Sequence, residues 1–219
     1  MKKVTPALFL KRALVYCVGL LVLAFGVVIS VNSNLGVSPV SSLPYVISRI
    51  LNAPLGTCVT VTYCFFILLQ VLIQRRDFKP VNLLEILFST IFGYFVDFAE
   101  MVMQGWAFDS YVGRLGMLAA SIVMIAVGLL IYMDAQLVPM PMEGLVACIA
   151  GKTGKTFGNV KTVIDCLVVV IGIVLCFIFL GEIQGIREGT IITAIVTGKL
   201  MGVLRKWITP KVRQICAAE

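Results

Sequence analysis

The sequence predicts an all-α polytopic membrane protein built from two inverted-topology repeats. Three observations support this fold class: the composition is too apolar for a water-soluble domain, the chain divides into long apolar runs, and its two halves align with each other. Hydrophobic residues make up 60% of the 219-residue chain and charged residues 13%, whereas soluble domains carry about 25% charged residues. We therefore expect one membrane domain covering residues 1–219, with the lipid bilayer as its main partner.

Six apolar runs are long enough to cross a bilayer, which takes about 20 residues of helix. They cover residues 13–32, 57–74, 82–104, 114–134, 157–180 and 189–207. Two shorter runs, 40–51 and 142–151, would rise only about 15 to 18 Å as helices and would not cross alone. We predict six full spans plus two short broken or re-entrant half-helices. An eight-span topology is the alternative.

The distribution of the net charge of +7 favours the six-span topology. Lysine and arginine in short loops remain on the cytoplasmic side. With both short helices re-entrant, the N-terminus, the 75–79 loop, the 152–155 loop and the basic tail from residue 205 all lie inside. If both short helices crossed, the 75–79 loop would lie outside. We expect both termini to be cytoplasmic and no nucleic-acid partner.

Residues 23–73 align with residues 125–175 without gaps, so the two halves are predicted to be structural repeats. The matched pairs include Gly26 with Gly128, Leu35 with Leu137, Pro39 with Pro141, Leu43 with Leu145, Gly56 with Gly158 and Thr60 with Thr162. Repeat 1 covers about 10–105 and repeat 2 about 112–207. With three spans each, the second repeat would begin on the opposite side of the membrane, as in many secondary transporters. The alternative is that the repeat arose by duplication that serves only economical folding and has no role in transport. The first apolar run belongs to this repeat, so we interpret it as a retained helix rather than a cleaved signal peptide.

Each repeat contains a polar, proline-containing break before its short helix. The first break runs from Asn32 to Pro39 and the second from Asp134 to Gly144. Proline is tolerated at a helix start, so the short helices should begin near Pro39 and Pro141. Irregular backbone at membrane depth must be buried in protein or line water. The two breaks therefore predict one shared polar cavity.

Residues of the two breaks are our candidates for binding a small-molecule or ion substrate. They are Asn34, Ser38, Pro39, Ser41, Ser42, Met140, Glu143 and Gly144. Ser38, Ser41 and Ser42 surround the positive end of the first short helix, where an anionic group is favoured. Glu143 occupies the corresponding end of the second short helix. There it would bind a cationic substrate group or a coupling proton, or only stabilise the helix dipole.

Other charged residues lie inside the predicted spans, where they usually face the interior of the bundle or lie near an interface because charge in lipid is costly. We predict that Asp97, Asp134, Lys161 and Asp165 serve as coupling or charge-balancing residues. Lys161 and Asp165 are one helical turn apart, so they would also pair with each other without any substrate role. Glu85 lies near a predicted span end, where contact with the membrane interface would be ordinary.

No cofactor, metal site or catalytic centre is expected. The sequence contains no histidine, and its seven cysteines form no CxxC pair. The cysteines lie mostly in apolar runs, which favours a packing role over disulfides or metal binding. The HExxH, GxSxG and GxGxxG motifs are all missing from the sequence. An enzyme is therefore the least favoured functional class.

Several short motifs follow one another in a specific order and spacing. They are Leu35-Gly36-Val37-Ser38-Pro39, Gly56-Thr57, Gly93 with Asp97, Pro141-Met-Glu-Gly144, Lys161 with Asp165, and Gly189-Thr190 with Gly198. Together they resemble the YczE/YitT family of bacterial integral membrane proteins, and its YczE branch in particular, over residues 10–205. Similar members carry tryptophan after the first-break proline and an Arg-Asp pair before the second-break glycine. This chain has Val40, Met142 and Glu143 there, and the loss of that arginine would leave Glu143 freer to hold a proton or a cation.

The resemblance implies a bacterial inner-membrane protein and supports the architecture more than any one substrate. Our leading prediction is a secondary transporter that moves a small polar molecule or ion by alternating access, with a role for protons in the coupling. A channel of the same inverted-repeat design is the first alternative, and a non-transporting accessory or sensor subunit is the second. The small size of the chain leaves a homodimer open.

Overall fold

The computed structural model describes residues 6–75 and 83–217, and all regular structure in these ranges is helical, as predicted. The long helices are α1 (Pro6–Asn32), α3 (Leu55–Gln74), α4 (Leu84–Val102), α5 (Tyr111–Asp134), α7 (Phe157–Leu175) and α8 (Glu188–Ala217). A π-helical turn, η3 (Cys176–Leu180), continues α7. The two short helices are α2 (Pro39–Leu51) and α6 (Pro141–Thr153). At 13 residues each, the short helices rise about 20 Å, which is less than a bilayer core.

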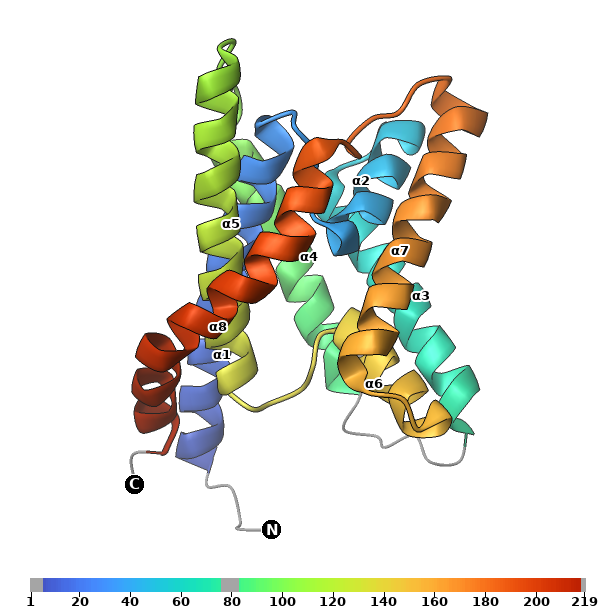
Figure 1. Ribbon diagram of the computed structural model, residues 1–219. Coiled ribbons are helices and arrows are strands. Elements are labelled where there is room, and N and C mark those ends of the chain that lie inside the picture. Colours follow the sequence, from blue (N-terminus) through green and yellow to red (C-terminus); the bar gives the residue numbers. More distant parts are fainter. Residues whose placement is uncertain (1–5, 76–82, 218–219) are drawn as a thin grey trace.

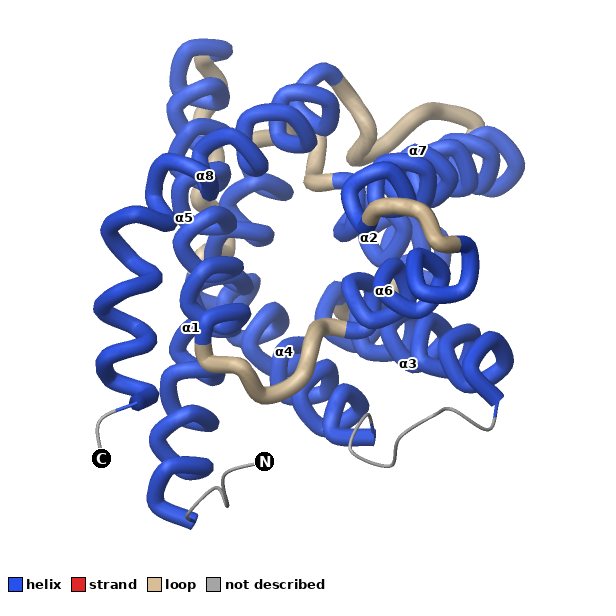
Figure 2. The backbone as a smooth tube through the Cα atoms, turned by 60° about the horizontal axis from the view of Figure 1, so that its bottom comes forward, coloured by secondary structure: helices blue, strands red, loops and turns tan. Residues whose placement is uncertain are grey.

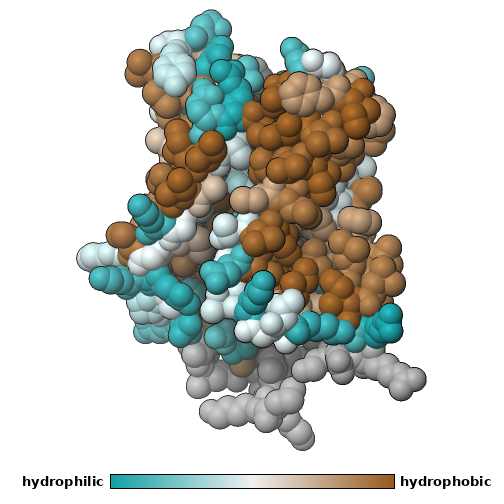
Figure 3. Space-filling view, turned by 45° about the vertical axis from the view of Figure 1, so that its right-hand side comes forward, coloured by the Kyte–Doolittle hydropathy of each residue, from teal (hydrophilic) through white to brown (hydrophobic). Residues whose placement is uncertain are grey.

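Within the described residues, four helices are long and apolar enough to cross a membrane: Leu8–Asn32, Leu55–Gln74, Tyr111–Asp134 and Phe157–Leu180. Their outer faces carry exposed apolar side chains, such as Val163, Leu167 and Val170 on α7. Figure 3 brings the side of the molecule with α7 and α3 forward and shows a broad hydrophobic surface above a hydrophilic lower edge. Water-soluble proteins rarely expose apolar surface on this scale, so this face fits contact with lipid.

The other two predicted spans, α4 and α8, carry more charge. α4 contains Glu85, Asp97 and Glu100, and the second half of α8 is basic. α8 also continues to Ala217, beyond the apolar run that ends near residue 207. Four of the six predicted spans thus meet the length and composition of a membrane helix, and a total of six stays a prediction.

The helix boundaries of the two halves correspond at a constant spacing. α1 ends at Asn32 and α5 ends 102 residues later at Asp134, and the starts of α2 and α6 show the same spacing. Asn34 and Gln136, also 102 residues apart, both have positive φ, at 53° and 54°, a conformation uncommon for residues other than glycine. The same sequence pattern therefore forms the same break, turn and short helix in both halves.

Corresponding helices run in opposite directions in Figure 1. α1 rises from the end of the molecule where α8 finishes, whereas α5 descends toward that end. α2 lies in the upper part and α6 in the lower part, and the α4–α5 and α7–α8 connections both lie at the top.

α1 and α5 form the most extensive helix–helix contact in the described chain. Glycines bring their backbones together: a Cβ atom on Gly19 would lie 2.6 Å from the Tyr132 nitrogen, and one on Gly128 would lie 2.7 Å from the Leu23 nitrogen. Such close approach of small residues is the usual way in which helices associate in lipid, where hydrophobic burial supplies little driving force. The two halves are thus joined along their first helices.

The helices form two groups. The first group contains α1, α4, α5 and α8, with α1 packed on α4 and α5, and α5 packed on α8. The second group contains α2, α3, α6 and α7, with α3 packed on α6 and α2 packed on α7. Figure 2 shows α1, α5 and α8 on one side and the second group on the other. Each group therefore takes matching helices from both halves.

The two groups are joined chiefly where α3 packs on α4. Gly56 and Gly93 meet so closely that a Cβ atom on Gly56 would overlap the Gly93 carbonyl oxygen. No comparable packing joins α7 to α8 within residues 6–75 and 83–217, and Cβ atoms on Gly158 and Gly198 would meet open space. The two groups are therefore packed together where α3 meets α4 and are separate at α7 and α8.

Candidate functional site

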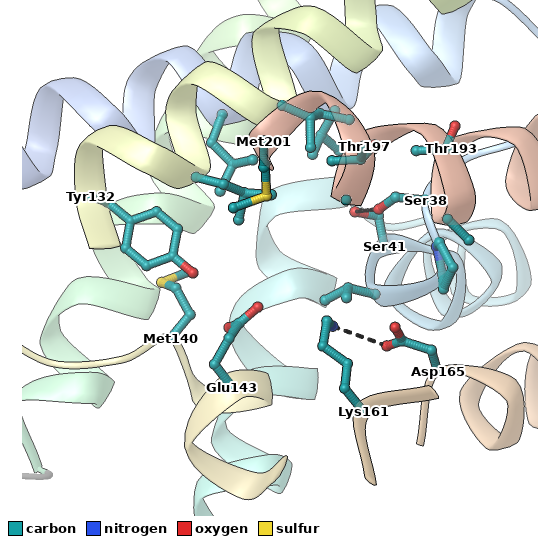
Figure 4. Close-up of a pocket in the computed structure, with 18 of the residues that line it drawn as sticks. Ser38, Ser41, Tyr132, Met140, Glu143, Lys161, Asp165, Thr193, Thr197 and Met201 are labelled. Atoms are coloured by element: carbon teal, nitrogen blue, oxygen red, sulfur yellow. Dashed lines mark hydrogen bonds and ion pairs between the residues drawn. The ribbon is translucent and has the colours of Figure 1, made fainter. Parts of the chain in front are cut away.

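A cavity of about 170 Å³ lies between the two helix groups. Part of its wall is apolar and includes Leu23 from α1, Phe92 from α4 and Ile125 from α5. Polar residues of its lining include Ser38, Ser41, Tyr132, Glu143, Lys161, Asp165, Thr193 and Thr197. Figure 4 shows that these side chains come from α2, α5, α6, α7 and α8 and surround the same space. Both predicted breaks therefore contribute to one polar cavity.

Hydrogen bonds hold the backbone of the first break. The Gly189 nitrogen donates to the Leu35 carbonyl oxygen at 2.9 Å, and the Val37 nitrogen donates to the Gly185 carbonyl oxygen at 2.9 Å. The segment before α8 is thus paired with the segment before α2. Irregular backbone is tolerated at membrane depth when it is satisfied in this way. The pairing places Ser38 at the start of α2, beside the cavity.

The positive end of α2 opens onto the cavity. Ser38 precedes Pro39, the first residue of α2; its Oγ donates to Ser41 Oγ at 3.0 Å and accepts no capping hydrogen bond from the helix backbone. Both hydroxyl groups line the cavity. Ser42 Oγ instead donates to the Pro39 carbonyl oxygen at 2.7 Å and lies outside the cavity lining.

Glu143 lies in the first turn of α6, next to Met140, which also lines the cavity. Figure 4 shows the Glu143 carboxyl group and the Tyr132 hydroxyl group pointing toward one another at one side of the cavity. Both residues also line a second cavity of about 290 Å³ at the second break, near Gln136 and Pro139. Within the described ranges, Glu143 forms no ion pair. Glu143 therefore lies between two cavities and is not part of an ion pair among these residues.

A buried network holds the start of α6 in place. Gln70 Nε2 donates to the Pro141 carbonyl oxygen at 3.0 Å and to Glu85 Oε2 at 2.9 Å, and both side chains are 1% exposed. The expectation that Glu85 contacts the membrane interface is wrong, because the Gln70 amide supplies a donor inside the bundle. Gly144 packs against the Gln70 side chain and does not line the main cavity.

α7 contributes two opposite charges to the cavity. Lys161 Nζ lies 3.2 Å from Asp165 Oδ1, which confirms the pairing expected from their spacing. Both side chains also line the cavity. The pair is therefore neutral as a unit while remaining in contact with the site.

α8 contributes two threonines, Thr193 and Thr197, that the sequence analysis did not select. Both are buried, and neither hydroxyl group has a hydrogen-bond partner in the described chain. Threonines in helices often donate to a carbonyl four residues earlier, as Thr62 does to Cys58 at 2.7 Å. The two threonines are four residues apart, which places them on one helix face. That spacing was one available sequence signal, and the other is that the third apolar runs of the two halves align loosely, with Thr193 matching Thr90.

Three predicted residues lie away from the cavity. Asn34 is exposed, and its carbonyl oxygen accepts a hydrogen bond from Arg187 Nη1 at 3.3 Å. Asp97 Oδ1 accepts a hydrogen bond from the Gly56 nitrogen at 2.6 Å, at the start of α3.

Asp134, the third, ties the end of α5 to the end of α8. It accepts hydrogen bonds from Thr209 Oγ1 at 2.5 Å and from Arg213 Nε at 3.3 Å. With Ser42 and Gly144, five of the predicted residues therefore lie outside the lining. The cavity gathers the other seven: Ser38, Pro39, Ser41, Met140, Glu143, Lys161 and Asp165.

Comparison with known proteins supports the resemblance seen in the sequence. The chain is 29% identical over 189 residues to the uncharacterized membrane protein YczE of Bacillus subtilis (strain 168), covering 85% of this chain and 81% of that protein. It is 26% identical over 189 residues to the uncharacterized protein YyaS of the same organism, covering 86% of this chain and 89% of that protein. No solved structure matches the chain. The family of unknown function DUF6198 matches residues 10–206, so the chain belongs to this family of YczE-like membrane proteins.

Proposed function

We propose that this protein is a secondary transporter that moves a small polar molecule or ion across the bacterial inner membrane by alternating access. The observation that supports it best is the cavity between two helix groups that are packed together at α3–α4 but not at the matching α7–α8 pair. Alternating access needs a fixed site and two closures that exclude each other. In the opposite state, α7 would pack on α8 and α3 would separate from α4.

The proposed membrane arrangement is six spans in two inverted repeats, with α2 and α6 as half-helices and both termini cytoplasmic. The constant spacing of 102 residues between helix boundaries and the opposite directions of matched helices support it. The α6–α7 connection and the end of α8, which are rich in lysine and arginine, lie at the end of the molecule where α1 begins. Basic segments of this kind remain cytoplasmic.

Glu143 is the proposed coupling residue. It stands between two cavities, on a half-helix whose start is fixed by Gln70, and it has no ion pair in the described chain. A carboxyl group placed this way can exchange a proton or a cation between the two sides as the helix groups move.

The experiment that tests alternating access measures access to the cavity from each side of the membrane. In a background with all seven cysteines replaced by alanine, Ser41→Cys reports modification by a membrane-impermeant cationic thiosulfonate in right-side-out and inside-out vesicles. We expect modification from both faces, because the two states exchange. Adding Gly158→Cys and Gly198→Cys and oxidising them should lock α7 onto α8 and slow modification from one face at least tenfold.

The alternatives predict different results. A channel would leave Ser41→Cys reactive from both faces after the lock, because one continuous pathway serves both sides. An accessory subunit would show either no reaction or no effect of oxidation. Gly158→Cys without Gly198→Cys is the matched control, since it cannot form the cross-link, and reduction should restore access from both faces.

A further inference from the structure

Among the residues that the structure describes, the cavity is lined by two carboxyl groups but by only one basic side chain. Its charged side chains are Glu143, Lys161 and Asp165, and the Lys161 ammonium group is already 3.2 Å from Asp165. Glu143 itself forms no ion pair among residues 6–75 and 83–217, although Lys161 is near enough to interact with it electrostatically. A carboxylate removed from bulk water is costly unless an opposite charge accompanies it. A bound cation or a proton would balance the Glu143 carboxylate.

Unpaired hydroxyl groups lie across the cavity from Glu143. Thr193 and Thr197 are 1% and 9% exposed, and their Oγ atoms have no hydrogen-bond partner in the described part of the chain. Figure 4 shows them on α8, with Glu143 on the opposite side of the same space. An alkylammonium group has three N–H donors and no acceptor. A carboxylate together with hydroxyl oxygens is the set of acceptors that such a group requires.

The size and the remaining wall of the cavity limit the rest of the ligand. Its volume of about 170 Å³ is similar to that of an apolar cavity of about 150 Å³ that holds benzene. Leu23, Phe92 and Ile125 supply apolar contacts, and Tyr63 adds an aromatic ring to the lining. Aromatic rings also attract cations through their negative faces. The wall therefore suits a compact apolar body attached to a charged group.

We propose that the cavity binds a small primary amine, with its ammonium group at Glu143 and its apolar body against the wall formed by α1, α4 and α5. This inference rests on the proposed carrier function and adds the substrate class to it. An anion would bring a second negative charge to Glu143.

A set of three probes of nearly equal size tests the charge preference. Benzylamine, benzyl alcohol and benzoate differ mainly in charge, at +1, 0 and −1. Binding to the purified protein is measured by calorimetry and by the increase in unfolding temperature, because a ligand that binds the folded state stabilises it. We expect saturable binding of benzylamine, at least tenfold weaker binding of benzyl alcohol, and no binding of benzoate.

Three variants test whether the charges in the cavity, rather than correct folding alone, determine the affinity for benzylamine. Glu143→Gln should weaken benzylamine binding at least tenfold. Asp165→Asn should also weaken it, because the released Lys161 then neutralises Glu143. Lys161→Gln should strengthen it about threefold or more, because the cavity gains a second unbalanced carboxylate. Opposite effects of the last two changes cannot arise from simple misfolding, and Glu182→Gln in the exposed α7–α8 connection is the matched control.

The amine assignment is overturned if benzyl alcohol binds as tightly as benzylamine, or if Glu143→Gln leaves benzylamine affinity unchanged. The access experiment with Ser41→Cys needs no ligand, so its outcome is independent of this one. If access to Ser41→Cys depends on the side of the membrane but amines are not preferred, the carrier proposal stands and the amine proposal is rejected. If amines are preferred but access does not depend on the side of the membrane, the amine-binding proposal stands and the carrier proposal is rejected.

Discussion

The α3–α4 pair and the α7–α8 pair come from matching parts of the two halves, but only the first pair is packed. At α3–α4, Gly56 and Gly93 let the two backbones approach closely, and Asp97 accepts a hydrogen bond from the Gly56 nitrogen. At α7–α8, the counterpart Gly158 faces open space, and the cavity lies between the helices. A repeated sequence therefore does not impose the same packing on both halves in one conformation. In a protein that alternates, the two closures must differ by only a few kcal/mol, so that each state is populated.

The largest expected effect comes from placing a side chain in the closed contact. Gly93→Leu should lower the free energy of unfolding by about 3 kcal/mol or more, because overpacking forces the two backbones apart. Thermal unfolding of the purified protein measures it. Gly202→Leu on α8 is the matched control, since a Cβ atom there meets open space, and it should change stability by less than about 1 kcal/mol. Similar losses for the two variants would contradict the asymmetry.

A side chain added to α8 where it faces open space should affect the closure of α7 on α8 rather than the stability of the protein. Gly198→Leu has room in this conformation, so unfolding should change by less than about 1 kcal/mol. The leucine would obstruct closure of α7 on α8, and Ser41→Cys should lose access from one face at least tenfold. Gly116→Leu on α5, also in open space, should leave access from both faces intact. Unchanged access in Gly198→Leu would argue against closure at this place.

The smallest expected effect concerns the charged hydrogen bond at the closed side. Asp97→Asn keeps an oxygen acceptor near the Gly56 nitrogen but removes the charge, which should cost about 1 kcal/mol, since charge-assisted hydrogen bonds are roughly twice as strong as neutral ones. The change in unfolding temperature measures this cost. Asp109→Asn in the exposed α4–α5 connection is the control. An equal effect at both positions would mean that the Asp97 charge does not stabilise the α3–α4 contact.

The breaks and the short helices could be predicted from the sequence because their signals are local. The runs 40–51 and 142–151 correspond to α2 at Pro39–Leu51 and α6 at Pro141–Thr153, each starting at a proline. Five of the seven candidate residues that line the cavity lie in the breaks or at the starts of the short helices, and the other two, Lys161 and Asp165, lie on α7.

The remaining features depend on distant partners, which no local pattern specifies. Gln70 removes Glu85 from the membrane interface, and Thr209 with Arg213 holds Asp134 away from the cavity. Thr193 and Thr197 resemble ordinary helix residues until the fold places them opposite Glu143. The asymmetry between the halves does have a sequence signal: in the register that aligns Thr90 with Thr193, Gly93 and Asp97 align with Val196 and Leu200.

The contact between α1 and α5 sets an order for biosynthesis. The residues of α1 that pack most closely on α5, such as Gly19 and Gly26, meet partners that lie roughly a hundred positions later in the chain. A ribosome adds about 5–20 residues per second, so α1 waits roughly 5–20 s in the membrane before α5 is made. During that time, the glycine-lined face of α1 cannot yet pack against α5. The first half produced alone would keep that face against lipid, whereas the two halves made together as separate chains could complete the contact and assemble.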